Sequence, residues 1–151
     1  TPTPTPTAPT RLTSSKYTIN QSSQYISKIA VDTKVSSLKS GINENSSYIK
    51  VYDGSKEVSS SATLGTGMEV RLMDGSKVVK RYTVVVTGDV NGDAKIDLTD
   101  FIQVKANTLK LRTLTDENKK AADTNGDGKV GLTDFLQIKK HTLGMGKIVA
   151  K

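Results

Sequence analysis

The chain is 151 residues long, a length that suits one domain or two small ones. It has no Cys, which excludes a disulfide framework, a zinc–thiolate site and thiol catalysis, and its single His141 argues against Ser–His and metal–His chemistry. The formal charge of +7 would suit a nucleic-acid partner, but the bases are scattered and form no run or stripe. No apolar run approaches the ~18 residues of a membrane span, so we expect neither nucleic acid nor membrane as a partner.

The N-terminus reads TPTPTPTAPT, which holds all 4 prolines of the chain. Proline fixes φ and lacks an N–H, so this stretch predicts an extended spacer that rises about 3 Å per residue. We expect residues 1–15 to be a Thr/Pro linker that joins folded modules, and the chain to be the C-terminal piece of a longer protein. A disordered tail with no upstream partner is the alternative.

Residues 16–87 show mainly strand-like patterning. The segments 48–52, 68–73 and 78–87 are β-branched or alternate apolar with charged residues, and Asp-Gly pairs follow the first two. Residues 33–42 predict a short helix that Asp32 or Thr33 would cap. The sequence therefore predicts a small β-rich module, of α+β or sandwich-like type.

This module offers no catalytic set, since it lacks His and Cys and its acids show no paired spacing. Its tyrosines could form a sugar-stacking face, although tyrosines in strands are more often half-buried sheet residues. They are Tyr17, Tyr25, Tyr48, Tyr52 and Tyr82. A structural or spacer role is the preferred interpretation, and carbohydrate binding is the alternative.

An internal repeat begins after residue 88. The segment 89–109 recurs as 123–143, with the same residue at most positions and conservative exchanges such as Ile96/Val130 at several others. Chance would give only one or two matches, so the repeat is real and each copy is one structural unit.

The spacing of the acids in each copy is that of a calcium loop. Ca²⁺ takes six to eight oxygen ligands, which a twelve-residue loop supplies from positions 1, 3, 5, 7, 9 and 12. In the first loop these are Asp89, Asn91, Asp93, the Lys95 carbonyl, Asp97 and Asp100. In the second they are Asp123, Asn125, Asp127, the Lys129 carbonyl and Asp134. We expect two bound Ca²⁺ ions; Mg²⁺ fits less well because it prefers six short, rigid contacts.

Each loop departs from the ideal pattern in its own way. The first has Ala94 at position 6, where the turn needs a positive φ, at a cost of roughly 1–2 kcal/mol. The second has Gly128 there, but Gly131 at position 9 leaves a water to supply that ligand. The sequence does not decide which site binds more tightly.

Each loop leads into an amphipathic helix, predicted over 98–110 and 132–144, and a shorter helix is predicted over 115–122. A β-branched run, not a helix, precedes the first loop. The C-terminal part, residues 88–151, is therefore predicted to be an all-α pair of calcium loop–helix motifs that follows the β-rich module.

Two loop–helix halves with these ligands resemble a dockerin domain over about 88–146. The resemblance implies half EF-hands that fold on calcium and bind a cohesin, which attaches secreted enzymes or scaffold proteins to a cellulosome. It also implies that residues 16–87 are an X-type module, because a Thr-Pro linker and such a module are common neighbours of dockerins. Partner contacts in the family come from loop positions 10 and 11 and from the following helix. Here those positions are Leu98, Thr99, Lys105, Ala106, Leu132, Thr133, Lys139 and Lys140.

The alternative for the two leucines is burial in the core, and for the lysines a solvated helix face. Because the Leu-Thr and Lys residues occur in both halves, we favour a symmetric surface that could dock in two orientations related by about 180°. The Leu-Thr pair departs from the Ser-Thr pair of many type I dockerins, which leaves the cohesin class open.

The expected function is calcium-dependent anchoring of a secreted, cellulosome-associated protein, with no catalysis and a monomeric chain apart from the cohesin. A structural or sensory calcium module, with residues 16–87 as a carbohydrate-binding module, is the alternative. Steady extracellular calcium argues against a sensor.

Overall fold

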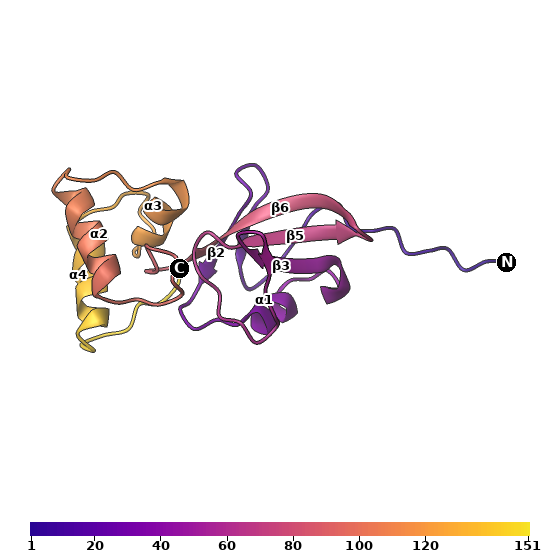
Figure 1. The fold of residues 1–151 in the computed structure, drawn as a ribbon, viewed down its shortest axis with the longest axis horizontal. Helices are drawn as coiled ribbons and strands as arrows, with labels where there is room; N and C mark the ends of the chain where they lie inside the picture. Colours follow the sequence, from indigo (N-terminus) through magenta and orange to yellow (C-terminus); the bar gives the residue numbers. More distant parts are fainter.

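The computed structural model describes residues 1–151 and consists of a six-stranded sheet and four α-helices (Figure 1). The strands are β1 (Thr18–Asn20), β2 (Tyr25–Ile29), β3 (Ile49–Asp53), β4 (Lys56–Glu57), β5 (Glu69–Asp74) and β6 (Lys77–Val86). The helices are α1 (Val35–Gly41), α2 (Leu98–Thr108), α3 (Asp116–Ala122) and α4 (Leu132–Thr142), with a 3-10 turn η1 at Ser46–Tyr48. No helix has the length and apolar character to cross a bilayer.

The sheet is mixed, with the strand order β1-β2-β6-β5-β3-β4. All neighbouring strands pair antiparallel except β2 and β6, which run parallel with Ile26 opposite Val84. A parallel pair needs a long crossover connection, and the chain between β2 and β6 supplies it with α1 and the three strands β3 to β5.

The predicted fold class was wrong. The sequence predicted an α+β or sandwich-like module followed by a separate all-α unit, whereas the structure is a single mixed sheet with four helices. Strand patterning shows which segments are extended but not how they pair, and β1 and β2 are too short and polar to stand out. The expected domain boundaries, at 15/16 and 87/88, stay predictions.

The main core lies between α1 and the sheet and contains 15 buried residues. Helix α1 contributes Val35 and Leu38, and β6 contributes Tyr82, Val84 and Val86. Burial of such apolar side chains is worth about 1.5–3 kcal/mol each, so this cluster dominates the stability of the sheet.

The folded chain begins at Leu12, before the first strand. Its side chain is fully buried in the main core, and its N–H donates to the Tyr82 hydroxyl at 3.0 Å. The Pro-rich residues ahead of it form no regular secondary structure and extend away from the sheet (Figure 1).

Helix α1 begins later than predicted. Its N-cap is Lys34, because Thr33 Oγ1 donates to the Ala30 carbonyl at 2.7 Å and Asp32 adopts φ +67° in the preceding turn. Both candidate caps therefore lie in the preceding turn, where the Thr33 hydroxyl bonds to the backbone instead of capping the helix.

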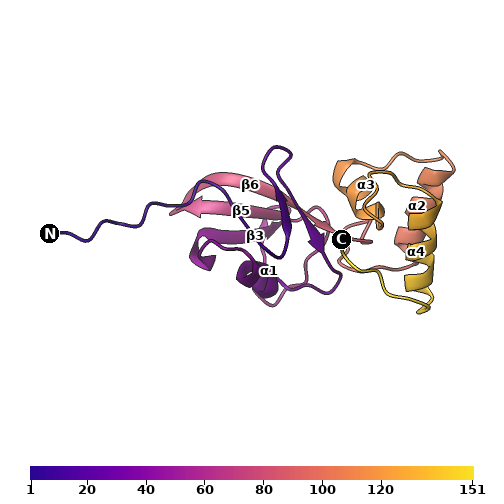
Figure 2. The same cartoon turned by 180° about the vertical axis from the view of Figure 1, so that it is seen from behind.

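Helices α2 and α4 pack side by side at the end of the molecule opposite the N-terminus, and α3 lies between them and the sheet (Figures 1 and 2). They enclose a small second core of Val90, Val104, Leu114, Ala122 and Ile138. The Phe101 and Phe135 rings, at equivalent positions of the repeat, lie 4.8 Å apart between their centroids. This tilted contact of two aromatic rings joins the two halves.

Candidate metal centre and docking face

The two acidic loops adopt the same backbone bend. Position 6 has a positive φ in both, +67° at Ala94 and +83° at Gly128, and so has position 4, +83° at Gly92 and +76° at Gly126. The first loop therefore takes the left-handed conformation that the spacing requires, although Ala94 occupies it at the expected energetic cost.

The carboxylate at position 1 of each loop accepts hydrogen bonds from the backbone of its own loop. Asp89 Oδ1 accepts from the Gly92 N–H at 2.8 Å, and its Oδ2 from the Ala94 N–H at 3.1 Å. Asp123 accepts in the same way from Gly126 at 2.8 Å and Gly128 at 2.8 Å. These hydrogen bonds hold each loop in its bent conformation without a metal ion.

The position-12 carboxylates close the loops and cap the helices. Asp100 Oδ1 accepts from the Val90 N–H at 2.7 Å and the Asn91 N–H at 3.0 Å, and its Oδ2 from the Asp97 N–H at 2.8 Å. Asp134 is the equivalent residue in the second loop, and both side chains are buried. Each therefore joins the start of its loop to the N-cap of the following helix, where a negative charge is favoured.

The intermediate positions point to solvent. Asp93 accepts from Asn91 Nδ2 at 2.9 Å and from the Lys95 N–H at 3.0 Å, and both aspartate and lysine are exposed. The second loop repeats this with Asp127, which accepts from Asn125 Nδ2 at 3.0 Å and the Lys129 N–H at 2.9 Å. The carbonyls of Lys95 and Lys129, the predicted position-7 ligands, accept no hydrogen bond.

Position 9 differs between the loops, as the sequence indicates. Asp97 is the N-cap of α2 and its Oδ1 accepts from the Thr99 N–H at 2.7 Å. Gly131 takes the same place before α4 and has no side chain to offer. The first loop therefore presents one carboxylate more than the second.

The first loop carries electrostatic strain. Burial raises the pKa of the Asp89 carboxyl to about 6, partly offset by its backbone donors, and the nearby Asp100 carboxylate raises it further. Burial also raises the pKa of Asp100, with a contribution from Asp93. Carboxylates that disfavour each other's charge are stabilised by a cation placed among them.

Without calcium, the free energy of unfolding should fall as the pH rises from 5 to 7. Asp89 binds its proton more tightly in the folded chain (pKa about 6) than in an unfolded one (about 3.9), so ionisation across this window disfavours the fold. We expect a loss of about 1–2 kcal/mol, measured by urea unfolding in chelator. Asp89→Asn should remove most of this pH dependence; an unchanged pH dependence would contradict the assignment.

The donor set fits Ca²⁺ in its chemistry. Every predicted ligand is an oxygen of Asp, Asn or the backbone, which is the preference of a hard cation. In this arrangement no group of three or more Asp, Glu or His side chains converges closely enough to hold a metal. The carboxylates instead bond to the loop backbone, so the loops are bent in advance while their acidic side chains stay apart.

The predicted partner residues lie on the surface. Leu98 is 58% exposed and Leu132 is 64% exposed, which excludes the core alternative for both leucines. Thr99, Thr133, Lys105, Lys139 and Lys140 are exposed, and Ala106 is half-buried.

Two apolar grooves cross the α2–α4 pair, and they have equivalent lining residues although their volumes differ. The first groove, of about 90 Å³, is lined by Leu98, Phe101, Lys139, Thr142 and Leu143. The second groove, of about 190 Å³, is lined by Leu132, Phe135, Lys105, Thr108 and Leu109. Each residue of one groove has its repeat counterpart in the other, so the internal repeat is expressed as two matching surfaces that each combine both helices.

Sequence reasoning found only part of these grooves. It named the leucine at the helix start and one lysine of each groove as partner residues. It did not name Phe101 and Phe135, Thr108 and Thr142, or Leu109 and Leu143. Their position in the aligned repeats was a usable signal, since both threonines are identical in the two copies. Of the residues it named, Thr99, Ala106, Thr133 and Lys140 line neither groove.

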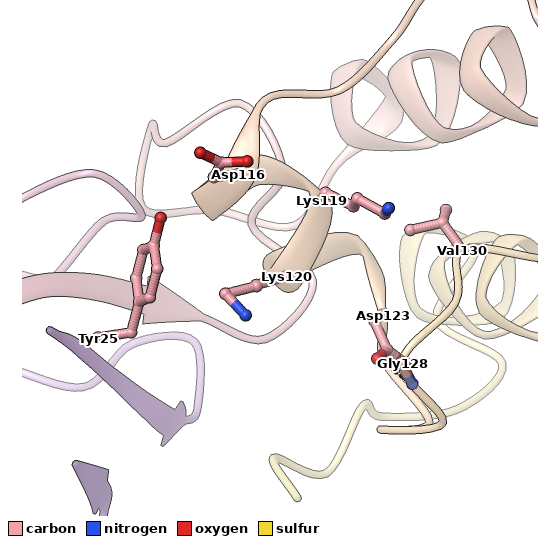
Figure 3. Close-up of a pocket in the computed structure, with 7 residues that line it drawn as sticks. All are labelled: Tyr25, Asp116, Lys119, Lys120, Asp123, Gly128 and Val130. Atoms are coloured by element: carbon pink, nitrogen blue, oxygen red, sulfur yellow. Dashed lines mark hydrogen bonds between the residues drawn. The ribbon is translucent and has the colours of Figure 1, made fainter. Parts of the chain in front are cut away.

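A larger cavity of about 330 Å³ lies where α3, the second loop and Tyr25 of the sheet face one another (Figure 3). Tyr25 of β2 lies on one side and Asp123, Gly128 and Val130 lie on the other. The Lys120 ammonium lies 5.1 Å from the centroid of the Tyr25 ring, which is within reach of a cation–π contact.

The tyrosines do not form an exposed row. Tyr17 and Tyr82 are buried in the main core, and the Arg71 guanidinium lies over the Tyr52 ring at 3.7 Å from its centroid. A sugar-stacking surface needs flat, accessible rings, so this arrangement gives the carbohydrate-binding alternative no support.

Two loop–helix halves with oxygen donors define a pair of half EF-hand motifs. Residues 87–143 match the family model of the dockerin type I domain. Dockerin domains bind calcium and anchor proteins to one another through cohesins, so the match implies these two properties for residues 87–143. The match does not reach the linker or the sheet. Comparison with curated proteins and with solved structures gives no match.

Proposed function

We propose that the chain anchors a secreted enzyme or scaffold protein to a cellulosome-type complex, by docking α2 and α4 on a cohesin when two Ca²⁺ ions are bound. The chain itself has no catalytic role and is monomeric apart from the cohesin. The observation that carries the proposal is the pair of equivalent apolar grooves, which lie within the segment that matches the dockerin type I domain.

The grooves have the character of a docking surface. Leu98, Leu132, Ile102 and Leu136 are all more than 40% exposed on one pair of helices, and lysines lie beside them. Exposed apolar side chains with a polar rim are typical of protein–protein interfaces. Helices α2 and α4 lie at the end of the molecule opposite the N-terminal tail, so a partner docked there leaves the tail free (Figure 2).

Calcium bound to the two loops would stabilise the starts of the helices that form this surface. The predicted ligands Asp100 and Asp134 also cap the helices that carry the grooves, so each loop and its helix form one unit. A bound cation would neutralise the carboxylates of each loop and add the free energy of metal binding to the stability of the loop. Loss of the ion should therefore leave the helix starts, and with them Leu98 and Leu132, held only by the hydrogen bonds of these caps and less firmly fixed.

Because the grooves are equivalent, we propose that the domain docks in two orientations related by about 180°. Replacing Leu98 and Thr99 by Ala should weaken cohesin binding less than about threefold, and so should replacing Leu132 and Thr133. All four replacements together should weaken it more than about a hundredfold, because neither orientation keeps its leucine anchor. Isothermal titration calorimetry measures each affinity.

Leu111→Ala is the control, since Leu111 is 79% exposed and lines neither groove. Its affinity should equal that of the parent chain. Loss of all binding from one pair alone would rule out the two-orientation proposal.

A further inference from the structure

Residues 65–67, which lie in the turn between β4 and β5, pack directly on the first acidic loop (residues 89–100). The Thr66 N–H, in the turn ahead of β5, donates to Asp89 Oδ2 at 2.9 Å. Asp89 is fully buried and is the predicted position-1 ligand of that loop. A backbone donor from outside the loop thus orients one of its own metal ligands.

Beside this hydrogen bond, the backbone of the turn at residues 65–67 is in contact with the backbone of the first loop. A Cβ atom added at Gly65 would lie 2.6 Å from the Gly92 carbonyl oxygen and 3.2 Å from the Ala94 nitrogen. A Cβ added at Gly92 would lie 2.4 Å from the Thr66 carbonyl oxygen. Side chains cannot be accommodated at these separations, so both positions require glycine for close approach.

The turn that provides Thr66 is itself fixed. Thr66 Oγ1 donates to the Val86 carbonyl at 3.2 Å and accepts from the Val86 N–H at 3.0 Å. The Gly67 N–H also donates to the Val84 carbonyl at 2.9 Å. Strand β6, which leads into the first loop, therefore also holds the turn that contacts that loop.

The second loop has no such support. No residue of the sheet part hydrogen-bonds to Asp123 or Asp134, and the 330 Å³ cavity separates this loop from β2 (Figure 3). A Cβ at Gly126, the counterpart of Gly92, would find its nearest neighbour 3.9 Å away. The repeat is thus nearly symmetric in sequence but asymmetric in its surroundings.

We infer that residues 65–67 are a positioning element for calcium at the first loop, so that metal binding there is coupled to the sheet while binding at the second loop is independent of it. The inference rests on the proposed calcium binding by both loops. It also accounts for Ala94, since a loop held from outside tolerates a strained residue that an unsupported loop replaces with Gly128.

Gly65→Ala tests this in the full chain. The variant alters only the contact, because Gly65 does not need a positive φ. Calcium titration followed by the backbone amide resonances of Ala94 and Gly128 reports the two loops separately. We expect first-loop affinity to fall at least about tenfold, as for loss of other outer-shell partners, and second-loop affinity to stay unchanged.

Gly146→Ala is the matched control, since an added Cβ there meets nothing closer than 3.9 Å and the residue needs no positive φ. It should leave both affinities at the parent values. The unchanged second loop serves as an internal check that the Gly65 variant is folded.

A second pair of variants tests the hydroxyl of Thr66. Thr66→Val removes both hydrogen bonds to Val86 and should weaken the first loop only, while Thr66→Ser keeps the hydroxyl and should restore it. Equal loss at both loops, or no loss at either, would overturn the coupling. Failure of the parent chain to bind calcium at all would instead overturn the proposed function.

Discussion

Asp134→Ala should destabilise the calcium-free chain by about 3 kcal/mol. Asp134 Oδ1 accepts from the Thr124 N–H at 2.9 Å and the Asn125 N–H at 3.1 Å, and its Oδ2 from the Gly131 N–H at 2.9 Å. Its side chain is 1% exposed, so these donors lose their acceptor in a buried place, at about 1 kcal/mol or more each. Urea unfolding in chelator measures the loss.

Asp134→Asn separates the capping role from the metal role. The amide oxygen can still accept from Thr124 and Asn125, so we expect roughly half of the lost stability to return. Calcium binding at the second loop should be absent in both variants, because an amide cannot replace the bidentate carboxylate. Retention of second-loop calcium by either variant would contradict the position-12 assignment.

Ile138→Ala is the second substitution with a large expected effect. Ile138 of α4 is fully buried among only 5 core residues between the loops and helices. Truncating a buried isoleucine costs about 2–5 kcal/mol, and so small a core has few neighbours that could close the cavity. We expect the loop–helix part to unfold well before the sheet, as followed by amide hydrogen exchange.

Leu136→Ala is the control on the same helix. Leu136 is 42% exposed, so its truncation should change the unfolding free energy by less than about 0.5 kcal/mol. Equal losses for the two variants would show that the small core does not hold α4 in place.

The loops and helices were the most predictable part of the molecule. The repeat fixed the spacing of Asp89 and Asp123, and helices α2 and α4 begin at the predicted Leu98 and Leu132. Calcium loops have a local code, because their ligands, bend and helix start lie within twelve residues. The positive φ of Ala94 was predictable for the same reason.

The sheet could be predicted only in pieces. Segments 48–52, 68–73 and 78–87 overlap β3, β5 and β6, but the pairing of β2 with β6 depends on residues almost 60 positions apart in the chain. No local pattern encodes such contacts. Leu12 likewise looks like part of a linker in the sequence. It belongs to the core only because the folded chain brings it into the same buried cluster as Tyr82.

The asymmetry between the two calcium loops was beyond sequence reasoning. Counting carboxylates and glycines compares the loops as isolated peptides, whereas the Thr66 N–H reaches Asp89 from 23 residues earlier. The same holds for the grooves, because each combines a leucine and a phenylalanine of one repeat with a lysine, a threonine and a leucine of the other. Tertiary packing, not spacing, brings these residues together.

We propose that calcium controls the docking of the chain on a cohesin. The most direct measurement is the affinity of the full chain for a panel of cohesin domains, first with calcium, then with EDTA, then with calcium restored. We predict binding to at least one cohesin in calcium, a loss of more than about a hundredfold in EDTA, and full recovery. Binding that persists in EDTA, or no binding to any cohesin in calcium, would contradict the claim.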